Sequence, residues 1–97
     1  MPTRDVDETF WRGYDQLTPE QQRRFLRVLR RFIEDVHIGS FRASLRVRSL
    51  VNHPGVWEMT WEGNDGRATF SYGPETIPGK RHIVWRRIGG HEIFQES

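Results

Sequence analysis

Hydrophobic and polar residues alternate on both sides of a Gly-Asn-Asp-Gly cluster in the middle of the chain. Residues 56–61 read VWEMTW, residues 67–72 read RATFSY, and the cluster occupies 63–66. Period-two alternation that flanks such a cluster is typical of a β-hairpin. A tight connection over 63–66 predicts the cross-strand pairs Glu62–Arg67, Thr60–Thr69, Glu58–Ser71, Trp57–Tyr72, Met59–Phe70 and Trp61–Ala68.

The two faces of this predicted hairpin differ in polarity. One face is apolar and carries Trp57, Met59, Trp61 and Phe70. Other elements must cover this face so that its apolar surface is removed from water. Glu58 and Arg67 belong to the other face, with threonines between them. We therefore expect the core under the aromatic face and any chemistry on the polar face or at its rim.

Two amphipathic helices are predicted before the hairpin. Apolar residues between Val6 and Leu17 recur with helical spacing and form one core-facing stripe, made of Val6, Phe10, Trp11, Tyr14 and Leu17. Thr18, Pro19 and Gln21 then provide an N-cap, a proline at the first helical position and a capping box. The second helix should run to about Asp35 and bury Phe25, Leu26, Val28, Leu29, Phe32 and Ile33.

The arginines of the second predicted helix fall mainly on its remaining surface. They are Arg23, Arg24, Arg27, Arg30 and Arg31. A charged run of this kind is usually the solvated face of an amphipathic helix. The alternative is a surface for RNA or for an acidic partner.

Further strands are predicted on either side of the hairpin. Residues 44–50 alternate, with Arg46 and Arg48 on one face. Residues 52–55 form a turn, residues 73–79 a loop, and residues 81–88 a last strand. Three consecutive apolar residues, at 83–85, place that last strand in the sheet interior. The chain is therefore predicted to be one α+β domain over 1–97, with two N-terminal helices packed on one face of a mostly antiparallel four-stranded sheet.

The composition restricts the class of protein. A chain of 97 residues has room for one core, and the absence of cysteine excludes disulfides and thiolate chemistry. The sequence has no apolar run as long as a membrane span and no signal-peptide pattern at its N-terminus. These features predict a cytoplasmic protein without a membrane partner.

Charge is unevenly distributed along the chain. The overall net charge is +2, but residues 1–20 hold two arginines against five acidic residues, so they carry −3 and the remainder +5. Fourteen of the fifteen basic residues are arginine. Arginine binds phosphate bidentately and stacks on bases, which suits a nucleic-acid partner. A genome-wide codon bias would explain the choice of arginine over lysine equally well, but not the clustering.

The sequence contains no metal or nucleotide motif, so we expect no cofactor. Its four histidines are too far apart for a recognised zinc signature. What remains is an arginine-rich polar face with one carboxylate and one or two histidines. Such a set is sufficient to cleave RNA, because the 2′-hydroxyl is the nucleophile and the protein supplies only a base, an acid and cations. The same residues would also serve a protein that only binds nucleic acid.

Several segments together resemble the RelE/ParE toxin superfamily. They are LRVRSL at 45–50, GVWEMTW at 55–61, GRATFSY at 66–72 and HIVWRRIGGHEIF at 82–94, preceded by the predicted helix pair. The resemblance extends from about Asp15 to Phe94 and rests on the order and spacing of these segments. It implies the toxin of a type II toxin–antitoxin pair.

Many proteins of this superfamily cut mRNA on the ribosome and are neutralised by an antitoxin. The resemblance therefore implies a metal-independent endoribonuclease whose partners are an antitoxin, mRNA and the ribosome. The alternative is a non-catalytic binding protein of the same fold, either a gyrase inhibitor like the ParE branch or a module that binds RNA or another partner.

The resemblance also assigns roles to residues of the polar face. Arg67 matches the arginine that holds the scissile phosphate; the alternative is a salt bridge with Glu62. Arg46 and Arg48 match positions that bind phosphate or stabilise the transition state, or they are solvated charges of an edge strand. Glu58 is the candidate base.

The remaining candidates lie in the last strand and the tail. His91 matches an acid–base position, and histidine needs no perturbation to act near neutral pH. Its alternative is a polar residue hydrogen-bonded to the sheet. Phe94 stands where several nucleases have Tyr, and its ring can stack on a base but cannot transfer a proton. Arg81 and Arg86 complete the predicted RNA-binding set.

Overall fold

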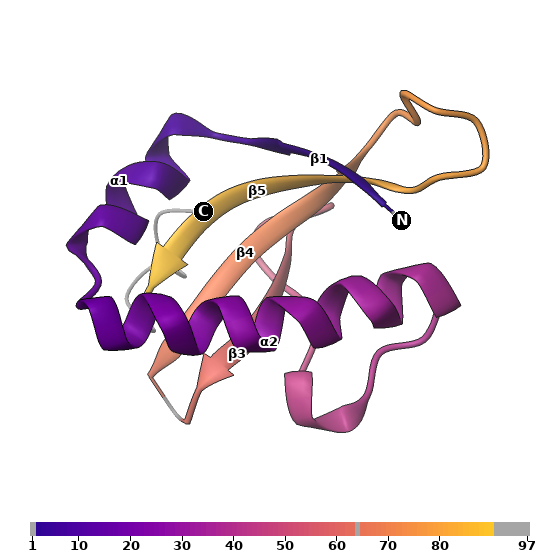
Figure 1. The fold of residues 1–97 in the computed structure, drawn as a ribbon. Helices are drawn as coiled ribbons and strands as arrows, with labels where there is room; N and C mark the ends of the chain where they lie inside the picture. The colour runs from indigo at the N-terminus through magenta and orange to yellow at the C-terminus, as the bar shows by residue number, and fades with distance from the viewer. Residues whose placement is uncertain (1, 64, 91–97) are drawn as a thin grey trace.

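The chain folds as two helices packed on a five-stranded sheet (Figure 1). This computed structural model describes residues 2–63 and 65–90. The elements are β1 (Thr3–Val6), α1 (Glu8–Gln16), α2 (Pro19–Ile38), the 3-10 turn η1 (Ala43–Leu45), β2 (Arg48–Ser49), β3 (Trp57–Glu62), β4 (Gly66–Gly73) and β5 (His82–Gly89). The sheet order is β1-β5-β4-β3-β2, with β1 parallel to β5 and the other pairs antiparallel. The predicted α+β class is confirmed, with one strand more than expected.

The additional strand is β1, which the prediction included partly in a helix. Val6 ends β1 and Asp7 caps α1, accepting a hydrogen bond from the Thr9 amide at 2.8 Å. That amide lowers the pKa of the Asp7 carboxyl. His82 of β5 holds β1 through both ring nitrogens, which lie 2.8 Å from Thr3 Oγ1 and 2.9 Å from Asp5 Oδ2.

The predicted start of α2 is confirmed and its predicted end is too early. Thr18 and Gln21 form the reciprocal capping box, and Gly39 ends the helix in the left-handed conformation, one turn later than expected. Trp11 and Leu26 were expected in the core but are 50% and 48% exposed. They lie beside Phe10 and Phe25, which occupy the core-facing positions of the two helices. No helix within residues 2–63 and 65–90 is long and apolar enough to cross a bilayer.

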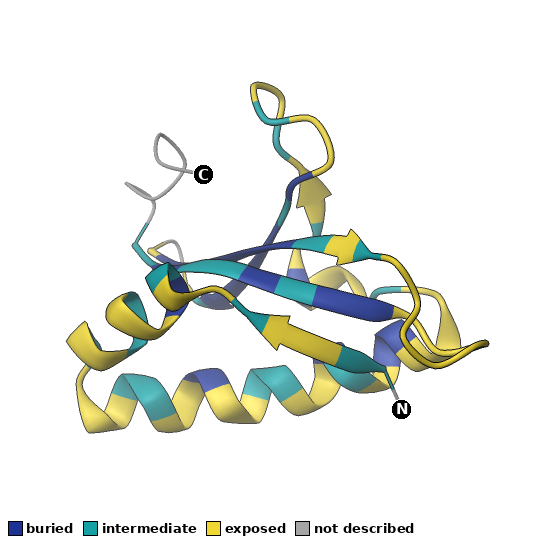
Figure 2. Cartoon of the chain, turned by 90° about the horizontal axis from the view of Figure 1, so that it is seen from above, coloured by how far each residue is buried: buried dark blue, intermediate teal, exposed yellow. Residues whose placement is uncertain are grey.

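An aromatic cluster joins both helices to the sheet. The ring of Trp85 lies 5.6 Å from that of Phe10, 6.0 Å from Phe25, 5.0 Å from Phe32 and 5.6 Å from Phe70, centroid to centroid. The buried residues are concentrated along the central strands (Figure 2). The predicted interior position of the last strand is confirmed, because β5 pairs with β1 on one side and β4 on the other.

The predicted hairpin has the right faces but the wrong register. Trp57 pairs with Phe70 and Thr60 with Arg67, and an irregularity beyond Thr60 places Glu62 opposite Gly66. The partners therefore differ by two positions from those expected along most of the hairpin. Because side chains alternate with period two, such a shift leaves each of them on its predicted face.

The predicted strand over 44–50 is mostly not a strand. Residues 43–45 form η1, Arg46 takes a left-handed conformation with φ of 48°, and only the two residues of β2 pair with β3. Leu45 is nevertheless buried in the core, so this hydrophobic position of the predicted pattern still lies on the core side. β2 is an edge strand, since it ends the sheet order, as the alternative role of Arg46 and Arg48 supposed.

α1 approaches β5 closely at Gly13, and a substitution of Gly13 tests this contact. A Cβ atom at Gly13 would lie 2.3 Å from the backbone oxygen of Ile88. Gly13→Ala should therefore destabilise the fold by about 1–3 kcal/mol, the usual cost of overpacking, although alanine has the higher helix propensity. Chemical denaturation should show this loss, while Asp15→Ala on the exposed side of α1 should leave the free energy of unfolding nearly unchanged. A Gly13→Ala protein as stable as the parent would contradict the close contact.

Candidate functional site

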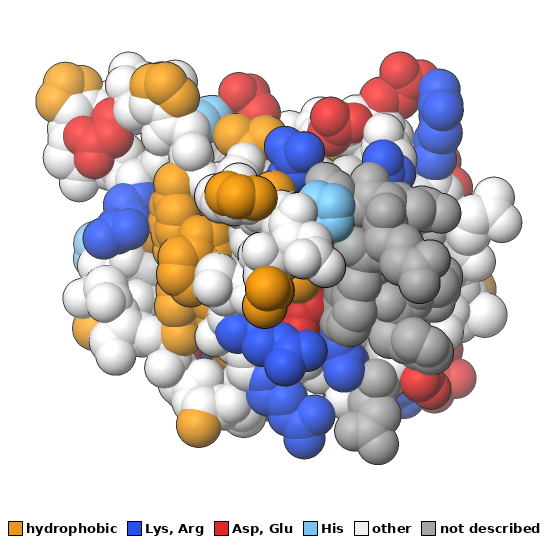
Figure 3. Space-filling view, turned by 180° about the vertical axis from the view of Figure 1, so that it is seen from behind, with side chains coloured by type: hydrophobic (Ala, Val, Ile, Leu, Met, Phe, Trp, Pro, Cys, Tyr) orange, Lys and Arg blue, Asp and Glu red, His pale blue; other side chains and the backbone are white. Residues whose placement is uncertain are grey.

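A cleft lies on the sheet face that is turned away from α2. It has a volume of about 370 Å³ and is lined by Arg46, Arg48, Glu58, Thr60 and Arg67. We call it the arginine cleft. Figure 3 shows Lys and Arg side chains gathered on this side of the molecule. Three arginines and one carboxylate that the sequence placed on a polar face thus line one cavity.

Glu58 is the buried carboxylate of the arginine cleft. Its side chain is 1% exposed, and Arg48, opposite it on β2, donates a hydrogen bond from Nε to Glu58 Oε1. The other oxygen, Oε2, is buried and accepts no hydrogen bond from any residue within 2–63 and 65–90. A buried carboxylate is costly without a cation, and Arg48 provides one beside Glu58. The two oxygens of Glu58 therefore differ: Arg48 holds Oε1, whereas Oε2 has no partner among the described residues.

Arg67 is more enclosed than the sequence suggested. It was expected on an exposed surface, but it is only 9% exposed, because β4 is flanked by β3 and β5. Its guanidinium donates to the Gly66 carbonyl at 3.1 Å. The Glu62 carboxylate, the alternative partner of Arg67, binds Arg24 of α2.

The backbone of Arg67 is fixed by its neighbours. The indole nitrogen of Trp61 donates to the Arg67 carbonyl at 2.9 Å in the protein interior. Gly66 leaves no room for a side chain, because a Cβ there would lie 2.5 Å from Glu62 Cβ. A rigid backbone presents the guanidinium in one place, as a preorganised phosphate contact requires.

The segment that carries Arg46 and Arg48 is anchored to the end of α2. Asp35, which is buried, accepts hydrogen bonds from the Arg42 amide at 2.8 Å and from two guanidinium nitrogens at 2.9 and 2.8 Å. These bonds hold the pKa of the Asp35 carboxyl below its usual range. Four residues later Arg46 adopts its left-handed conformation, which is uncommon for a residue with a side chain. This turn brings Arg46 to the rim of the cleft.

One further arginine, Arg87, lies on the sheet face of the arginine cleft and was not predicted from the sequence to belong to the site. A bulge in β5 leaves Arg86 out of the pairing, so that Phe70 pairs with Trp85 and Thr69 with Arg87. Thr69 faces away from the core, so Arg87 and not Arg86 lies beside it on the open face. A signal for the bulge was present in the sequence. Trp85 and Ile88 are three residues apart and cannot share one face of a regular strand, yet both are buried in the core.

Two predicted RNA-binding arginines lie outside the lining of the arginine cleft. Arg81 is at the opposite end of β5, where its guanidinium lies 5.3 Å from the centroid of the Tyr72 ring. Burial raises the pKa of the Tyr72 hydroxyl, and the Arg81 charge opposes this shift. Arg86 is half-buried, and its charge helps to lower the pKa of Asp7.

Two predicted site residues, His91 and Phe94, lie outside the described residues. The described chain leaves β5 at Gly89, which pairs with Arg67. Among the described residues, no group of three or more His, Cys, Asp or Glu side chains is placed to hold a metal ion. The chemistry available in the described part of the site is therefore that of arginine, one carboxylate and threonine hydroxyls.

Comparison with known proteins gives structural relatives only. No family model matches the sequence, and no curated protein matches it. The fold is similar to the crystal structure of a copper-bound mutant toxin from Helicobacter pylori, with a TM-score of 0.62 and 11% identity over 95% of this chain and 97% of that one. It is also similar to the solution structure of a conserved hypothetical protein from Helicobacter pylori, with a TM-score of 0.56, 12% identity and the same coverage. At such identities the likeness shows a shared fold.

The Asp35–Arg42 contact predicts an acid-dependent loss of stability. Because the folded-state pKa of Asp35 is lowered, its contribution is fully present above the unfolded-state pKa of about 4 and is lost as the pH falls through the folded value. Asp35→Asn should be less stable than the parent at pH 7, and the difference should shrink as the pH falls below about 4. Denaturant unfolding from pH 7 to 2 measures this, with exposed Asp15→Asn as the control. A difference that stays constant with pH would contradict this role of Asp35.

Proposed function

We propose that this protein is the toxin of a type II toxin–antitoxin pair and that it cleaves mRNA without a metal ion. The observation that carries the proposal is the arginine cleft, where three arginines and a buried carboxylate line one cavity of about 370 Å³. The fold similarity to a Helicobacter pylori toxin supports the toxin role. The resemblance to the RelE/ParE superfamily supports the choice of mRNA as substrate.

The roles follow from the chemistry of RNA cleavage. Glu58 Oε2 takes the proton of a 2′-hydroxyl, and the oxygen attacks the adjacent phosphorus. The bond to the 5′-oxygen breaks, leaving a 2′,3′-cyclic phosphate and a 5′-hydroxyl that receives a proton from an acid. His91 is our candidate for that acid, on the basis of the family resemblance. Arg67, with Arg46 and Arg48 beside it, stabilises the charge that rises on the phosphate.

The proposed partners are those of a ribosome-dependent toxin in the cytoplasm: mRNA, the ribosome and a neutralising antitoxin. A non-catalytic binding protein, such as a gyrase inhibitor, is the second candidate. One observation favours it: Glu58 is already bound by Arg48 and is 1% exposed, as a purely structural ion pair would be. In that case the cleft would bind an anionic partner without chemistry.

The toxin role predicts growth arrest. Expression from a tightly controlled promoter should stop bacterial growth, and sequencing of RNA 5′ ends should reveal new cuts within translated frames. Arrest with intact mRNA and inhibited DNA supercoiling would assign the protein to the gyrase-inhibitor class. Unimpaired growth with soluble protein present would argue for a binding module without toxicity.

The enzymatic role predicts separate effects on cleavage and on binding. Arg67→Ala and Glu58→Gln should each lower single-turnover cleavage of ribosome-bound mRNA by about a hundredfold or more, the usual scale for one preorganised group. Arg67→Lys should also be impaired, since an ammonium cannot replace a bidentate guanidinium. Binding to RNA should weaken much less, because these groups act mainly in the transition state.

Controls must exclude unfolding, because Arg67 and Glu58 are buried. Thermal melting of each variant should accompany the kinetics, and Arg23→Ala on the exposed surface of α2 is the matched control for loss of one cation. A folded Arg67→Lys or Glu58→Gln protein that cleaves at the parental rate would remove that residue from the catalytic site.

A further inference from the structure

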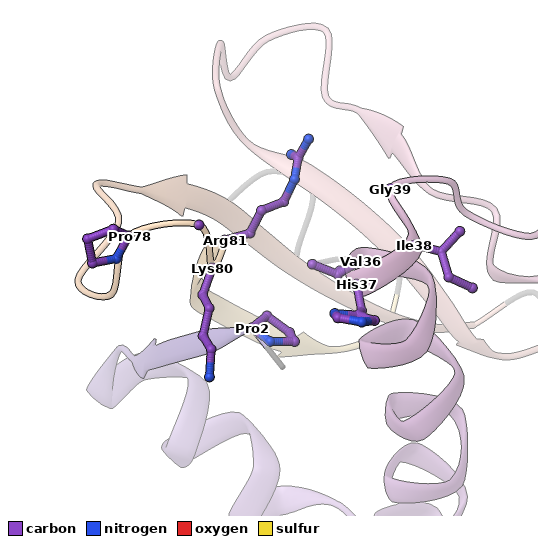
Figure 4. A pocket seen from close by; sticks show the side chains of 9 residues that line it. Pro2, Val36, His37, Ile38, Gly39, Pro78, Lys80 and Arg81 are labelled. Carbon is purple, nitrogen blue, oxygen red and sulfur yellow. The ribbon is translucent and has the colours of Figure 1, made fainter.

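A second cavity lies at the other end of the molecule, between the C-terminus of α2 and the chain that enters β5. It has a volume of about 520 Å³ and is lined by Pro2, Val36, His37, Ile38, Gly39, Pro78, Gly79, Lys80 and Arg81 (Figure 4). We call it the end pocket. Arg67 pairs with Gly89 at the start of β4, whereas Gly73 pairs with His82 at its end. The end pocket and the arginine cleft are therefore separated by the length of the strand.

The lining of the end pocket is cationic. Among the described residues, the lining includes Lys80, Arg81 and His37 and no carboxylate. Lys80 and His37 form no side-chain hydrogen bond or ion pair within residues 2–63 and 65–90. The positive charge of the pocket is therefore not neutralised by its own walls.

Nearby carboxylates are engaged elsewhere. Glu75 accepts a hydrogen bond from the Gly79 amide at 3.1 Å, Asp35 is held by Arg42, and Asp5 by His82. None of these carboxylates lines the pocket, so an anionic ligand is the natural counterpart of its cations. The volume lies within the range of 300–1,000 Å³ that is typical of small-ligand sites.

The arrangement of the cations favours a nucleic-acid strand over a single phosphate as the ligand. Lys80 and Arg81 are consecutive residues, but their side chains extend in different directions from the chain (Figure 4), and Arg81 lies over the Tyr72 ring. One phosphate would meet only one of these cations, whereas two successive phosphates of a nucleic-acid backbone could meet both. A base between those phosphates would lie toward the ring of His37.

The helix side of the pocket suits a base better than a phosphate. The C-terminus of α2 carries partial negative charge and carbonyls without intrahelical partners, which repel anions and accept hydrogen bonds. His37, Ile38 and Pro2 supply flat or apolar surface there, and exocyclic amino groups of bases are donors that match the carbonyls. Gly39 and Gly79, both with positive φ, present no side chain to the pocket rim.

We propose that the end pocket binds a single-stranded segment of RNA, with successive phosphates on Lys80 and Arg81 and a base against His37. This inference rests on the proposed function in that RNA is the partner. It adds a second RNA contact that is separate from the arginine cleft and takes no part in cleavage.

The test uses an RNA that cannot be cleaved. A fluorescent 2′-O-methyl hexanucleotide is titrated with the full chain at several salt concentrations. Each phosphate contact on single strands contributes about 0.7 to the slope of log affinity against log salt. Lys80→Gln and Arg81→Gln should each reduce the slope by about 0.7 and weaken binding severalfold at low salt. His37→Ala should weaken binding about fivefold or more, the lower end for a lost base-stacking contact, with no change in slope.

Arg12→Gln, at an exposed position of α1 that is paired with Glu8, is the matched control and should bind like the parent. All three test positions are exposed, so each variant should keep the parental melting temperature. Unchanged affinity and slope in Lys80→Gln and Arg81→Gln would overturn the proposal.

Amide NMR spectra locate the contact directly. The hexanucleotide should shift the signals of Gly39 and Gly79, and this shift should be lost in Lys80→Gln. Shifts confined to Thr60 and Thr69 would overturn the end pocket while leaving the arginine cleft as an RNA site. A poly-glutamate peptide that shifts Gly39 and Gly79 at lower concentration than RNA would also overturn it, in favour of an acidic protein partner. RNA binding at the end pocket by a protein that never cleaves RNA would count against the proposed function alone.

Discussion

Burial of Trp85 is the interaction on which the other features of the structure depend. Trp85 belongs to β5, which pairs with β1 and β4, and its ring meets rings from α1, α2 and β4. An aromatic pair of this kind contributes about 0.5–1.5 kcal/mol beyond the burial of its area. Because one side chain joins both helices to the sheet, the helices cover a single face. The opposite face is left to polar residues, and the arginine cleft lies there.

The need to bury residues of β5 in the core also determines which arginines of β5 face the side of the arginine cleft. Trp85 and Ile88 both enter the core, and their spacing of three residues requires the bulge that leaves Arg86 unpaired. Beyond the bulge the alternation of β5 is reversed, so Arg87 lies opposite Thr69 on the open face. Packing on one side of the sheet therefore sets the charge pattern on the other side, with no direct contact between the two.

Local patterns predicted much of the fold and the main residues of the site. The period-two alternation around Met59 and Phe70 gave the two faces of the hairpin, and the capping box at Thr18 gave the start of α2. The face of each side chain was predicted correctly despite the error in register, because the actual pairing differs by two positions. For that reason the polar residues Glu58 and Arg67 were correctly placed together although their pairing partners were wrong.

Features that depend on distant residues were not predictable in the same way. Strand β1 is short and polar, and it is held by His82, which is 79 residues from Thr3 in the sequence. The burial of Arg67 depends on strands that flank β4 on both sides. The left-handed turn at Arg46 comes four residues after Arg42, which is anchored on Asp35. In each case the contact that decides the structure joins two elements, and no local sequence pattern specifies how those elements lie relative to each other.

The contact between buried Glu58 and exposed Arg48 bears on the choice between an enzyme and a binder. The Arg48 side chain is 66% exposed, so water screens part of its attraction to the Glu58 carboxylate. A carboxylate at the base of a cationic cleft also weakens the attraction of that cleft for phosphate, which would be a disadvantage in a simple RNA-binding surface. As a general base, Glu58 would have to bring Oε2, which is buried and has no described partner, within hydrogen-bond reach of the substrate.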